Sequence, residues 1–425
     1  MGSQAGTVPT MVVAQSRSER WPDVYVAQSA RLRGSVAKWI VRSALRDLPM
    51  RLRFPDGRIY GAGGPGAPTL AVHRPEAFYA RIGARGLIGF GESYQAGEWG
   101  ADDLAGVLTV LGARVDALVP SSLQRLRRLY VARRPHAERN SPTGARRNIA
   151  RHYDLSDELF ASFLDPTMSY SSALFAQDEA GSPVASTGLL TLAQQRKIDR
   201  LLDLTGVGPG TRVLEVGSGW GELAVRAAAR GARVRTVTLS ENQRAYTARR
   251  AAQAGLGGAL AVELRDYRAI EGEYDVVLSV EMIEAVGREH WPQYFAMLAR
   301  VLAPGGRIGL QSITMAHHRM TATADTQTWI TKYIFPGGLI PSVTAIEENA
   351  ARFGLRVADD LAFGAHYAQT LRLWRERFCQ HADRLAALGF DETFRRTWDL
   401  YLSYCQAGFD CGYLDVHQFL ITARG

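Results

Sequence analysis

Apolar residues in the second half of the chain recur in two patterns that alternate with each other. Short apolar runs, typical of strands buried on both faces, are separated by segments with apolar residues three or four positions apart, as in amphipathic helices. This predicts strands at 212–216, 233–239, 260–264, 274–280, 306–313, 355–363 and 415–423, and helices at 193–204, 221–230, 241–254, 290–302 and 343–353, with 367–411 mostly helical. We therefore expect an α/β fold with a Rossmann-like, doubly wound sheet.

The pattern in the first half of the chain predicts a smaller α+β unit. Strands are expected near 51–60 and 69–73, and a helix is expected to begin at Pro75. The stretch from Gly86 to Trp99 is rich in glycine and aromatic residues, so we expect turns there, followed by a helix at 102–111. An arginine-rich segment, 121–151, then separates the two parts of the chain.

Residues 28–48 predict an amphipathic helix. Leu32, Val36, Trp39 and Ile40 recur at helical spacing, and basic residues occupy much of the remainder. Such a helix lies on a membrane surface or packs on its own domain, and the sequence leaves both open. The net charge of +8 indicates phosphate-bearing partners. Because no base-reading module is recognisable, we expect anionic lipid rather than nucleic acid.

Residues 213–221 read Val-Leu-Glu-Val-Gly-Ser-Gly-Trp-Gly, and a helical segment follows. A buried strand that ends in a glycine-rich turn lets the backbone approach a nucleotide ligand closely. A dinucleotide fingerprint would place a third glycine where this chain has Glu222. The acid Glu215 beside Gly217 and Gly219 instead suits S-adenosylmethionine (SAM), which carries an ammonium and a sulfonium group. The turn favours SAM and leaves a dinucleotide as the alternative.

Polar residues follow the next two strands. Thr238 and Leu239 end the second strand, and Gln243 lies one helical turn further on, so hydroxyl and amide groups can meet a ribose or an adenine edge. Asp266 and Tyr267 follow the third strand, where an acid can accept the adenine amino group and a ring can cover the base. Because parallel strands share one carboxyl edge, these residues are candidate cofactor contacts.

Two acids, Glu281 and Glu284, follow the fourth strand. If this turn is helical, the two side chains share a face. Two close carboxylates seldom both ionise easily, so one pKa should rise and that group can act as a general base near neutral pH. The alternative is a pair of solvent-exposed acids at a strand end.

The chain resembles the cyclopropane fatty-acid synthase family, which includes the mycolic acid methyltransferases. Besides the glycine turn, the resemblance rests on 151–156, 163–173, 266–268, 329–338 and the Phe-Gly-x-x-Tyr motif at 363–367. It covers 148–425 well and 50–115 less strongly. It implies a class I SAM-dependent methyltransferase domain at 148–425, an N-terminal lipid- and membrane-binding domain at 1–120 and a basic linker at 121–147.

The resemblance also implies the reaction. SAM would methylate a carbon of a cis double bond in a phospholipid acyl chain such as oleoyl, and a proton would leave the resulting carbocation. In the family a bound bicarbonate takes that proton, and three of its ligands correspond here to Glu284, Ile313 and Tyr367. By position, SAM contacts correspond to Tyr153, Tyr170, Ser171, Gly217, Gly219, Thr238, Leu239, Gln243 and Tyr267. A water-free tunnel lined by rings chosen from Trp329, Tyr333, Phe335, Phe363, Tyr367 and Trp374 is expected to shelter the cation.

The chain departs from the family at the bicarbonate site. The family's cysteine is Ser172 here, its histidine is Gln311, and a glycine of the cyclopropane-forming members is Glu281. One hypothesis is that Glu281 takes the place of the bicarbonate and accepts the proton itself. The alternative is that Ser172 and Gln311 still hold the anion.

These departures favour one product. The residues around Glu281 and 310–315 resemble the tuberculostearate-type branch, in which a hydride shift and proton loss give a 10-methylene fatty acyl chain. A cyclopropane synthase and a small-molecule N- or C-methyltransferase remain alternatives, as does a non-catalytic binding protein with a vestigial SAM turn. We expect a cytoplasmic enzyme, peripheral at the inner face of the cell membrane, with a flavin-dependent reductase acting on its product. No metal is expected, and a homo-oligomer stays open.

Overall fold

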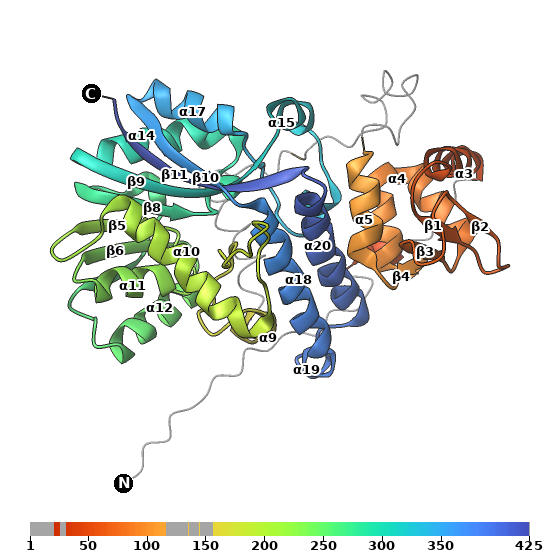
Figure 1. Cartoon of the computed structure of the whole chain (residues 1–425), viewed down its shortest axis with the longest axis horizontal. Helices are drawn as coiled ribbons and strands as arrows, with labels where there is room; N and C mark the ends of the chain where they lie inside the picture. Colours follow the sequence, from red (N-terminus) through yellow and green to blue (C-terminus); the bar gives the residue numbers. More distant parts are fainter. Residues whose placement is uncertain (1–20, 26–30, 116–134, 136–143, 145–155, 425) are drawn as a thin grey trace, which may run out of the picture.

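A mixed, seven-stranded sheet forms the centre of the second half of the chain (Figure 1). Its strands are β5 (Arg212–Val216), β6 (Arg233–Thr238), β7 (Leu260–Leu264), β8 (Tyr274–Val280), β9 (Leu302–Met315), β10 (Leu355–Ala362) and β11 (Leu414–Ala423), in the order β10-β11-β9-β8-β5-β6-β7. Strands β5 to β9 pair in parallel, whereas β11 runs antiparallel to both β9 and β10. The computed structural model describes residues 21–25, 31–115, 135, 144 and 156–424. The predicted α/β fold is confirmed.

Helices cover both faces of this sheet. Successive apolar residues of a strand point to opposite faces, as the pleat requires: Val213 packs on one side and Leu214 on the other. The first face is covered by α10 (Leu190–Thr205), α11 (Glu222–Ala229) and α12 (Glu241–Gln253), and the second by α14 (Trp291–Val301) and α17 (Val343–Arg352). The sheet is therefore buried on both sides, which leaves its carboxyl edge for chemistry.

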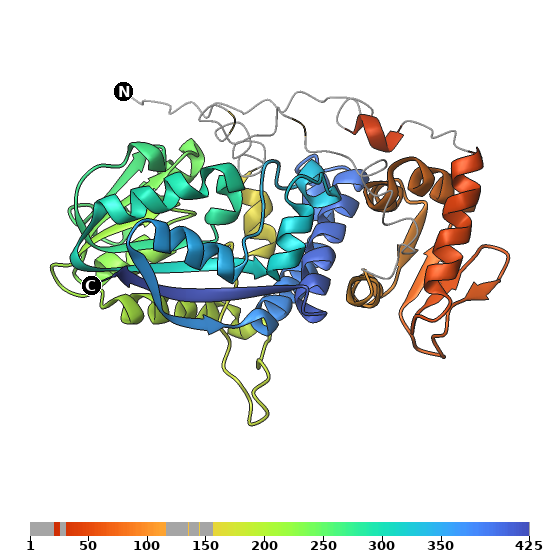
Figure 2. The same ribbon diagram turned by 90° about the horizontal axis from the view of Figure 1, so that it is seen from above.

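Two long helices, α18 (Gly364–Gln380) and α20 (Glu392–Asp410), lie between the sheet and the N-terminal unit (Figures 1 and 2). They pack on each other, and α20 also contacts α4 (Pro75–Gln95) and α5 (Leu104–Ala113). The short helices α9 (Asp157–Phe163), α13 (Ile283–Val286), α15 (His317–Thr323), α16 (Trp329–Tyr333) and α19 (Ala382–Ala387) complete this part. One apolar core, rich in aromatic rings, runs from the N-terminal unit through α20 to α9.

The N-terminal unit contains a four-stranded sheet, as the predicted α+β pattern required. Its strands are β1 (Arg51–Arg53), β2 (Ile59–Tyr60), β3 (Thr69–Val72) and β4 (Trp99–Ala101), and α2 (Pro22–Tyr25) and α3 (Arg31–Leu45) precede them. The turn region predicted for Gly86 to Trp99 is wrong, because α4 continues to Gln95. Gly86 adopts φ 57°, ψ −130° and only kinks the helix, so glycine here bends the chain without ending the element. The predicted linker at 121–147 lies outside the described residues except for 135 and 144.

Helix α3 packs on its own domain with one face. Ala37 and Leu45 are buried, and a Cβ on Gly34 would lie 3.5 Å from the backbone of Ala80 in α4. Val36 and Trp39, from the predicted apolar stripe, are 55% and 61% exposed. The helix thus packs through small residues and presents a valine and a tryptophan outward. No helix within the described ranges is long and apolar enough to cross a membrane.

Candidate active site

The glycine turn follows β5 at the carboxyl edge of the sheet. Gly217, Gly219 and Gly221 have φ values of 94°, 48° and 87°, the left-handed region that side chains disfavour. A Cβ on Gly217 would lie 3.3 Å from Met282, and one on Gly221 would lie 2.5 Å from Thr247. The turn therefore requires glycine for both conformation and space. Because these three residues carry no side chain, the backbone of the turn leaves room for the close approach of a SAM molecule.

Replacing Gly217 with alanine is expected to weaken SAM binding at least about tenfold, because the methyl group strains the turn and fills space beside Met282. Isothermal titration of SAM measures the effect. Gly255→Ala is the matched control, since Gly255 also has a positive φ of 69° but lies in open surroundings after α12. Equal affinities for the two variants would contradict a cofactor role for this turn.

Of the other predicted cofactor contacts, three lie along β6 and α12. Thr238 is buried and its hydroxyl donates to Oε1 of Gln243 at 2.8 Å. Leu239 is half-buried next to it. The pair Thr238–Gln243 therefore fixes one polar edge of the candidate cofactor site. Tyr153 lies outside the described residues.

Asp266 and Tyr267 lie after β7, at the same edge. Asp266 caps a 3-10 turn by accepting from the Arg268 amide and pairs with the Arg268 guanidinium at 2.6 Å. The Tyr267 ring packs edge-on to Tyr294, and burial raises the pKa of its hydroxyl to about 12. The tyrosine therefore offers a neutral ring, and the aspartate holds the turn that carries it.

Glu215 lies beneath the glycine turn. Its side chain is buried and accepts a hydrogen bond from the Thr236 hydroxyl at 2.5 Å, directly across the β5–β6 pair. Burial raises the pKa of this carboxyl to about 8, so the group is mostly protonated at neutral pH. It joins two strands under the turn, a position that the strand pattern alone did not reveal.

The carboxylate of Glu281 is the centre of the predicted catalytic residues. Its Oε1 accepts from the Ser172 amide at 2.9 Å and from the Gln311 side-chain amide at 2.8 Å. Its Oε2 accepts from the Tyr367 hydroxyl at 2.6 Å. Three donors from three distant parts of the chain thus converge on one carboxylate. These are the positions that the family resemblance assigns to the bicarbonate site.

Glu284 lies beside this group and is held separately. Its Oε1 accepts from the Ile313 amide at 2.6 Å and from the Ser312 hydroxyl at 2.9 Å. Its Oε2 is buried and has no hydrogen-bond partner among the described residues. Both glutamates are surrounded by protein, yet part of each side chain remains accessible. That combination is expected of side chains that line an internal slot.

The two carboxyls differ in charge. Burial raises the pKa of Glu284 to about 8, and the charge of Glu281 adds to the rise. Burial also raises the pKa of Glu281, but the hydrogen bonds from Tyr367, Ser172 and Gln311 and the charge of Lys197 oppose it. We conclude that at neutral pH Glu281 is the carboxylate and Glu284 the neutral acid.

The backbone that carries the two glutamates is not the helical turn that the sequence predicted. Helix α13 begins only at Ile283, and Glu281 precedes it with φ 49°. A left-handed glutamate is strained, and its amide is fixed by the Gln311 carbonyl at 2.8 Å. Glycine, which the resemblance places here in the cyclopropane-forming members, would adopt this conformation without strain.

Aromatic rings enclose the space next to Glu281. Tyr367 stacks on Phe409 and meets Trp374 edge-on, and Tyr170 lies 5.4 Å from Trp374 between ring centroids. The Tyr170 and Tyr401 hydroxyls are 2.6 Å apart. Of the other predicted tunnel residues, Phe335 contacts the Tyr401 ring, Phe363 packs on His366, and Trp329 and Tyr333 bond to Gln95 and Glu92 of α4. Only part of the predicted ring set therefore surrounds the carboxylate.

Sequence reasoning missed the supports behind these residues. Ser171, a predicted cofactor contact, accepts from the Lys197 ammonium at 2.6 Å. Gln418 of β11 donates to the Gln311 side-chain oxygen at 3.0 Å, which orients the Gln311 amide towards Glu281. The register that pairs Gln418 with Gln311 is a tertiary feature. One feature of the sequence could have drawn attention to Lys197: nearly all of the 50 basic residues are arginine, and the lysines are Lys38, Lys197 and Lys332.

Comparison with known proteins is consistent with this geometry. The family model described as mycolic acid cyclopropane synthetase matches residues 140–419. The tuberculostearic acid methyltransferase UfaA1 of Mycobacterium tuberculosis is 53% identical over 96% of each chain. The cyclopropane-fatty-acyl-phospholipid synthase of Escherichia coli K12 is 32% identical over 85% of this chain and 89% of its own. The crystal structure of mycolic acid cyclopropane synthase CmaA1 with SAH and CTAB matches 68% of this chain and 98% of its own, at 31% identity and a TM-score of 0.59.

Proposed function

The chain belongs to the mycolic acid cyclopropane synthetase family, and from this premise we propose that it is a SAM-dependent methyltransferase that adds a methylene branch to an unsaturated acyl chain of a phospholipid. The names of the two curated relatives support lipid methylation. The observation that carries the proposal is the Glu281 carboxylate, which three donors hold beside the neutral acid Glu284 and next to the Tyr367 ring.

When bound, SAM supplies an electrophilic methyl group, and its transfer to one alkene carbon breaks a C–S bond and leaves the neighbouring carbon as a cation. The glycine turn at 217–221, with Thr238 and Gln243, would hold the cofactor. The rings of Tyr367 and Trp374 exclude water and present π-electron density to the cation. Such shelter is needed because water would otherwise trap the cation as an alcohol.

Glu281 completes the reaction as a general base. After a hydride shifts from the methylated carbon to its cationic neighbour, the positive charge is on the carbon that bears the new methyl group. The Glu281 carboxylate accepts one proton from that methyl, and the C–H electron pair forms the exocyclic C=CH₂ bond. The overall change is one alkene and one SAM to one methylene-branched chain, one S-adenosylhomocysteine and one proton.

In this proposal Glu281 replaces the family's bicarbonate. The Ser172 amide, Gln311 and Tyr367 already donate to its carboxylate, so the donors available to an anion at this place are engaged. A bicarbonate beside Glu281 would also add a like charge in surroundings that already raise the pKa of both glutamates. We therefore infer a site that works without an added anion.

The decisive experiment supplies the purified protein with SAM and vesicles of oleoyl phospholipid. We expect acyl chains that gain one CH₂ by mass spectrometry and show exocyclic methylene protons by NMR. Cyclopropyl protons would instead assign the ring-forming activity, which shares the same cation. Methylation of free amines but not of vesicles would assign the small-molecule activity, and failure to bind SAM in calorimetry would indicate a non-catalytic protein.

We further propose that helix α3 places the enzyme on anionic membrane. Val36 and Trp39 project from a helix that also carries exposed Arg33 and Lys38, and this mixture suits the boundary between acyl chains and phosphate groups. Exchanging Val36 and Trp39 together for aspartate is expected to reduce binding to vesicles of anionic phospholipid at least about tenfold in a sedimentation assay. Val184 and Leu388, which are exposed apolar residues outside α3, give a control pair for the same exchange to aspartate. Unchanged binding by the α3 variant would contradict the proposal.

The chemistry of the product indicates a partner. A methylene-branched chain becomes a saturated methyl branch only when a hydride and a proton are added across the C=CH₂ bond. We propose that a reductase carrying a flavin performs that step on the released lipid, because hydride transfer is the chemistry of such a cofactor.

A further inference from the structure

The geometry points to Lys197 as the positioning residue that fixes the catalytic carboxylate of Glu281, acting through Ser171 and Ser172. This inference rests on the proposed role of Glu281. Lys197 belongs to α10, contacts neither glutamate by hydrogen bond among the described interactions, and is 2% exposed. A lysine is seldom buried this completely without a partner of opposite charge in contact.

The first link is a short hydrogen-bonded path. The Lys197 ammonium donates to the Ser171 hydroxyl at 2.6 Å, and Gln194, one turn earlier on α10, donates to the Ser171 carbonyl at 2.9 Å. The next amide along the chain, that of Ser172, donates to Glu281 at 2.9 Å. Helix α10 therefore holds Ser171 by both its hydroxyl and its carbonyl, and so sets the donor that faces the carboxylate.

A second link starts from the same helix and reaches the other donor. Arg200 donates to the side-chain oxygen of Gln418 at 2.8 Å. The Gln418 amide in turn donates to the Lys197 carbonyl and to Gln311, each at 3.0 Å. Gln311 is the side chain that holds Glu281 at 2.8 Å. Thus residues 194, 197 and 200 support two of the three donors to Glu281.

The charge of Lys197 gives the arrangement a measurable signature. The ammonium lies in the field of Glu281, Asp165 and Glu222, and its charge lowers the pKa of Glu281. Tyr367 and Glu284 are the other titratable groups at the carboxylate. Removing the positive charge should make Glu281 harder to ionise, so the pH at which turnover rises should move upward. A purely structural lysine would not have this effect.

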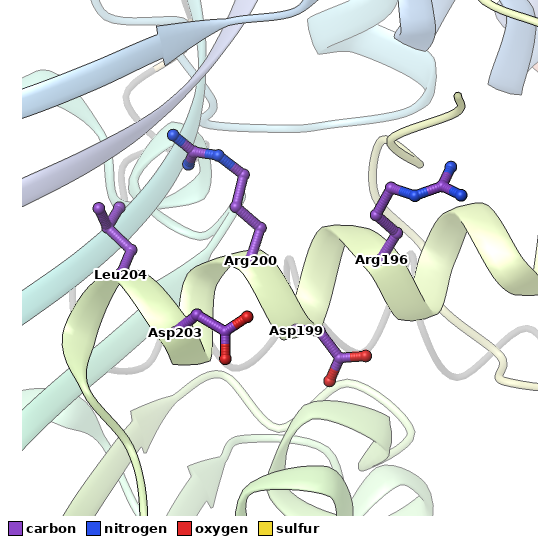
Figure 3. A pocket seen from close by; sticks show the side chains of 5 residues that line it. All are labelled: Arg196, Asp199, Arg200, Asp203 and Leu204. Carbon is purple, nitrogen blue, oxygen red and sulfur yellow. The ribbon is translucent and has the colours of Figure 1, made fainter. Parts of the chain in front are cut away.

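The surface of the same helix offers a matched control. Arg196 is the neighbour of Lys197 in sequence but is exposed and lines a shallow hollow with Asp199, Arg200, Asp203 and Leu204 (Figure 3). In that view Arg196 and Arg200 project to the same side of α10, away from Asp199 and Asp203. Arg196 donates to the Leu174 carbonyl at 3.3 Å, which is not part of the path from Lys197 to Glu281. Arg196→Met therefore removes one positive charge from the helix and keeps the hydrogen bonds of that path.

The test compares Lys197→Met and Lys197→Gln with Arg196→Met and wild type, in lipid methylation assays from pH 5.5 to 9. Both Lys197 variants should raise the pH of half-maximal turnover by about one unit. Lys197→Met should also lower the plateau rate at least about tenfold, and Lys197→Gln less, since its amide still donates to Ser171. SAM affinity by calorimetry should change less than about threefold.

The outcomes separate this inference from the function on which it rests. A folded Lys197 variant with the wild-type pH profile overturns the inference, even if its melting temperature falls. Lys197→Gln, which keeps a donor in the buried site, provides this test if the methionine variant does not fold. Wild-type protein that methylates no lipid at any pH would instead refute the proposed function. A shift in Arg196→Met equal to that of the Lys197 variants would show a general charge effect and also overturn the inference.

Discussion

Replacing Glu281 by glutamine is expected to lower turnover about a thousandfold, because an amide cannot accept the proton that leaves the new methyl group. SAM binding should change little, since the glycine turn and Thr238–Gln243 are untouched. The amide also meets the Ser172 and Gln311 donors with a group of the same shape, so folding should be retained. Turnover of oleoyl phospholipid and SAM titration measure the two effects. Glu348→Gln on the surface of α17 is the control.

Glu281→Gly extends this prediction. Glycine adopts φ 49° without strain, and its missing side chain leaves Ser172, Gln311 and Tyr367 as unused donors around a space the size of a small anion. Added bicarbonate is therefore expected to restore turnover of Glu281→Gly in a saturable way, but not that of Glu281→Gln, in which the amide fills the space. A Glu281→Gln enzyme with full turnover, or equal rescue of both variants, would exclude Glu281 as the base.

Much of the fold follows from local pattern. The strands β5, β6, β7 and β8 could be predicted to within a residue because each is a short segment rich in valine, leucine or threonine, with a helix or a turn on either side. The pattern failed at Gly86, where glycine and aromatic residues suggested turns. There Phe90 and Tyr94 pack their rings on Trp99, and this burial continues α4 past the kink. Tertiary packing outweighed the local preference.

Some features of the candidate site could also be predicted from local pattern, and others could not. Glu281, Glu284 and the glycine turn could be predicted because the carboxyl ends of parallel strands meet at one edge. Which of the two glutamates is charged could not be predicted, because it depends on the hydrogen-bond donors that each one meets. For Glu281, Tyr367 lies on α18 and Ser172 lies in the segment before α10. Gln418 and Lys197 act through other residues, and no local pattern identifies a support of that kind.

Glu284→Gln is expected to stabilise the folded protein at alkaline pH. Burial raises the pKa of Glu284 to about 8 in the folded protein, against about 4.5 in the unfolded chain. Between these values the folded state binds a proton that the unfolded state releases, so the free energy of unfolding contributed by this group falls as pH rises. Glutamine resembles the protonated acid and carries no such cost.

The melting temperature of Glu284→Gln should therefore equal that of wild type near pH 5 and exceed it by about 5 °C at pH 9. Oε1 of the amide can still accept from Ile313 and Ser312, so the strand edge is kept. Turnover should fall only about tenfold, far less than in Glu281→Gln, because the neutral partner is replaced by a neutral group. A stability gain that does not depend on pH would contradict the raised pKa. A thousandfold loss of turnover, with an active Glu281→Gln, would make Glu284 the base and Glu281 the neutral partner.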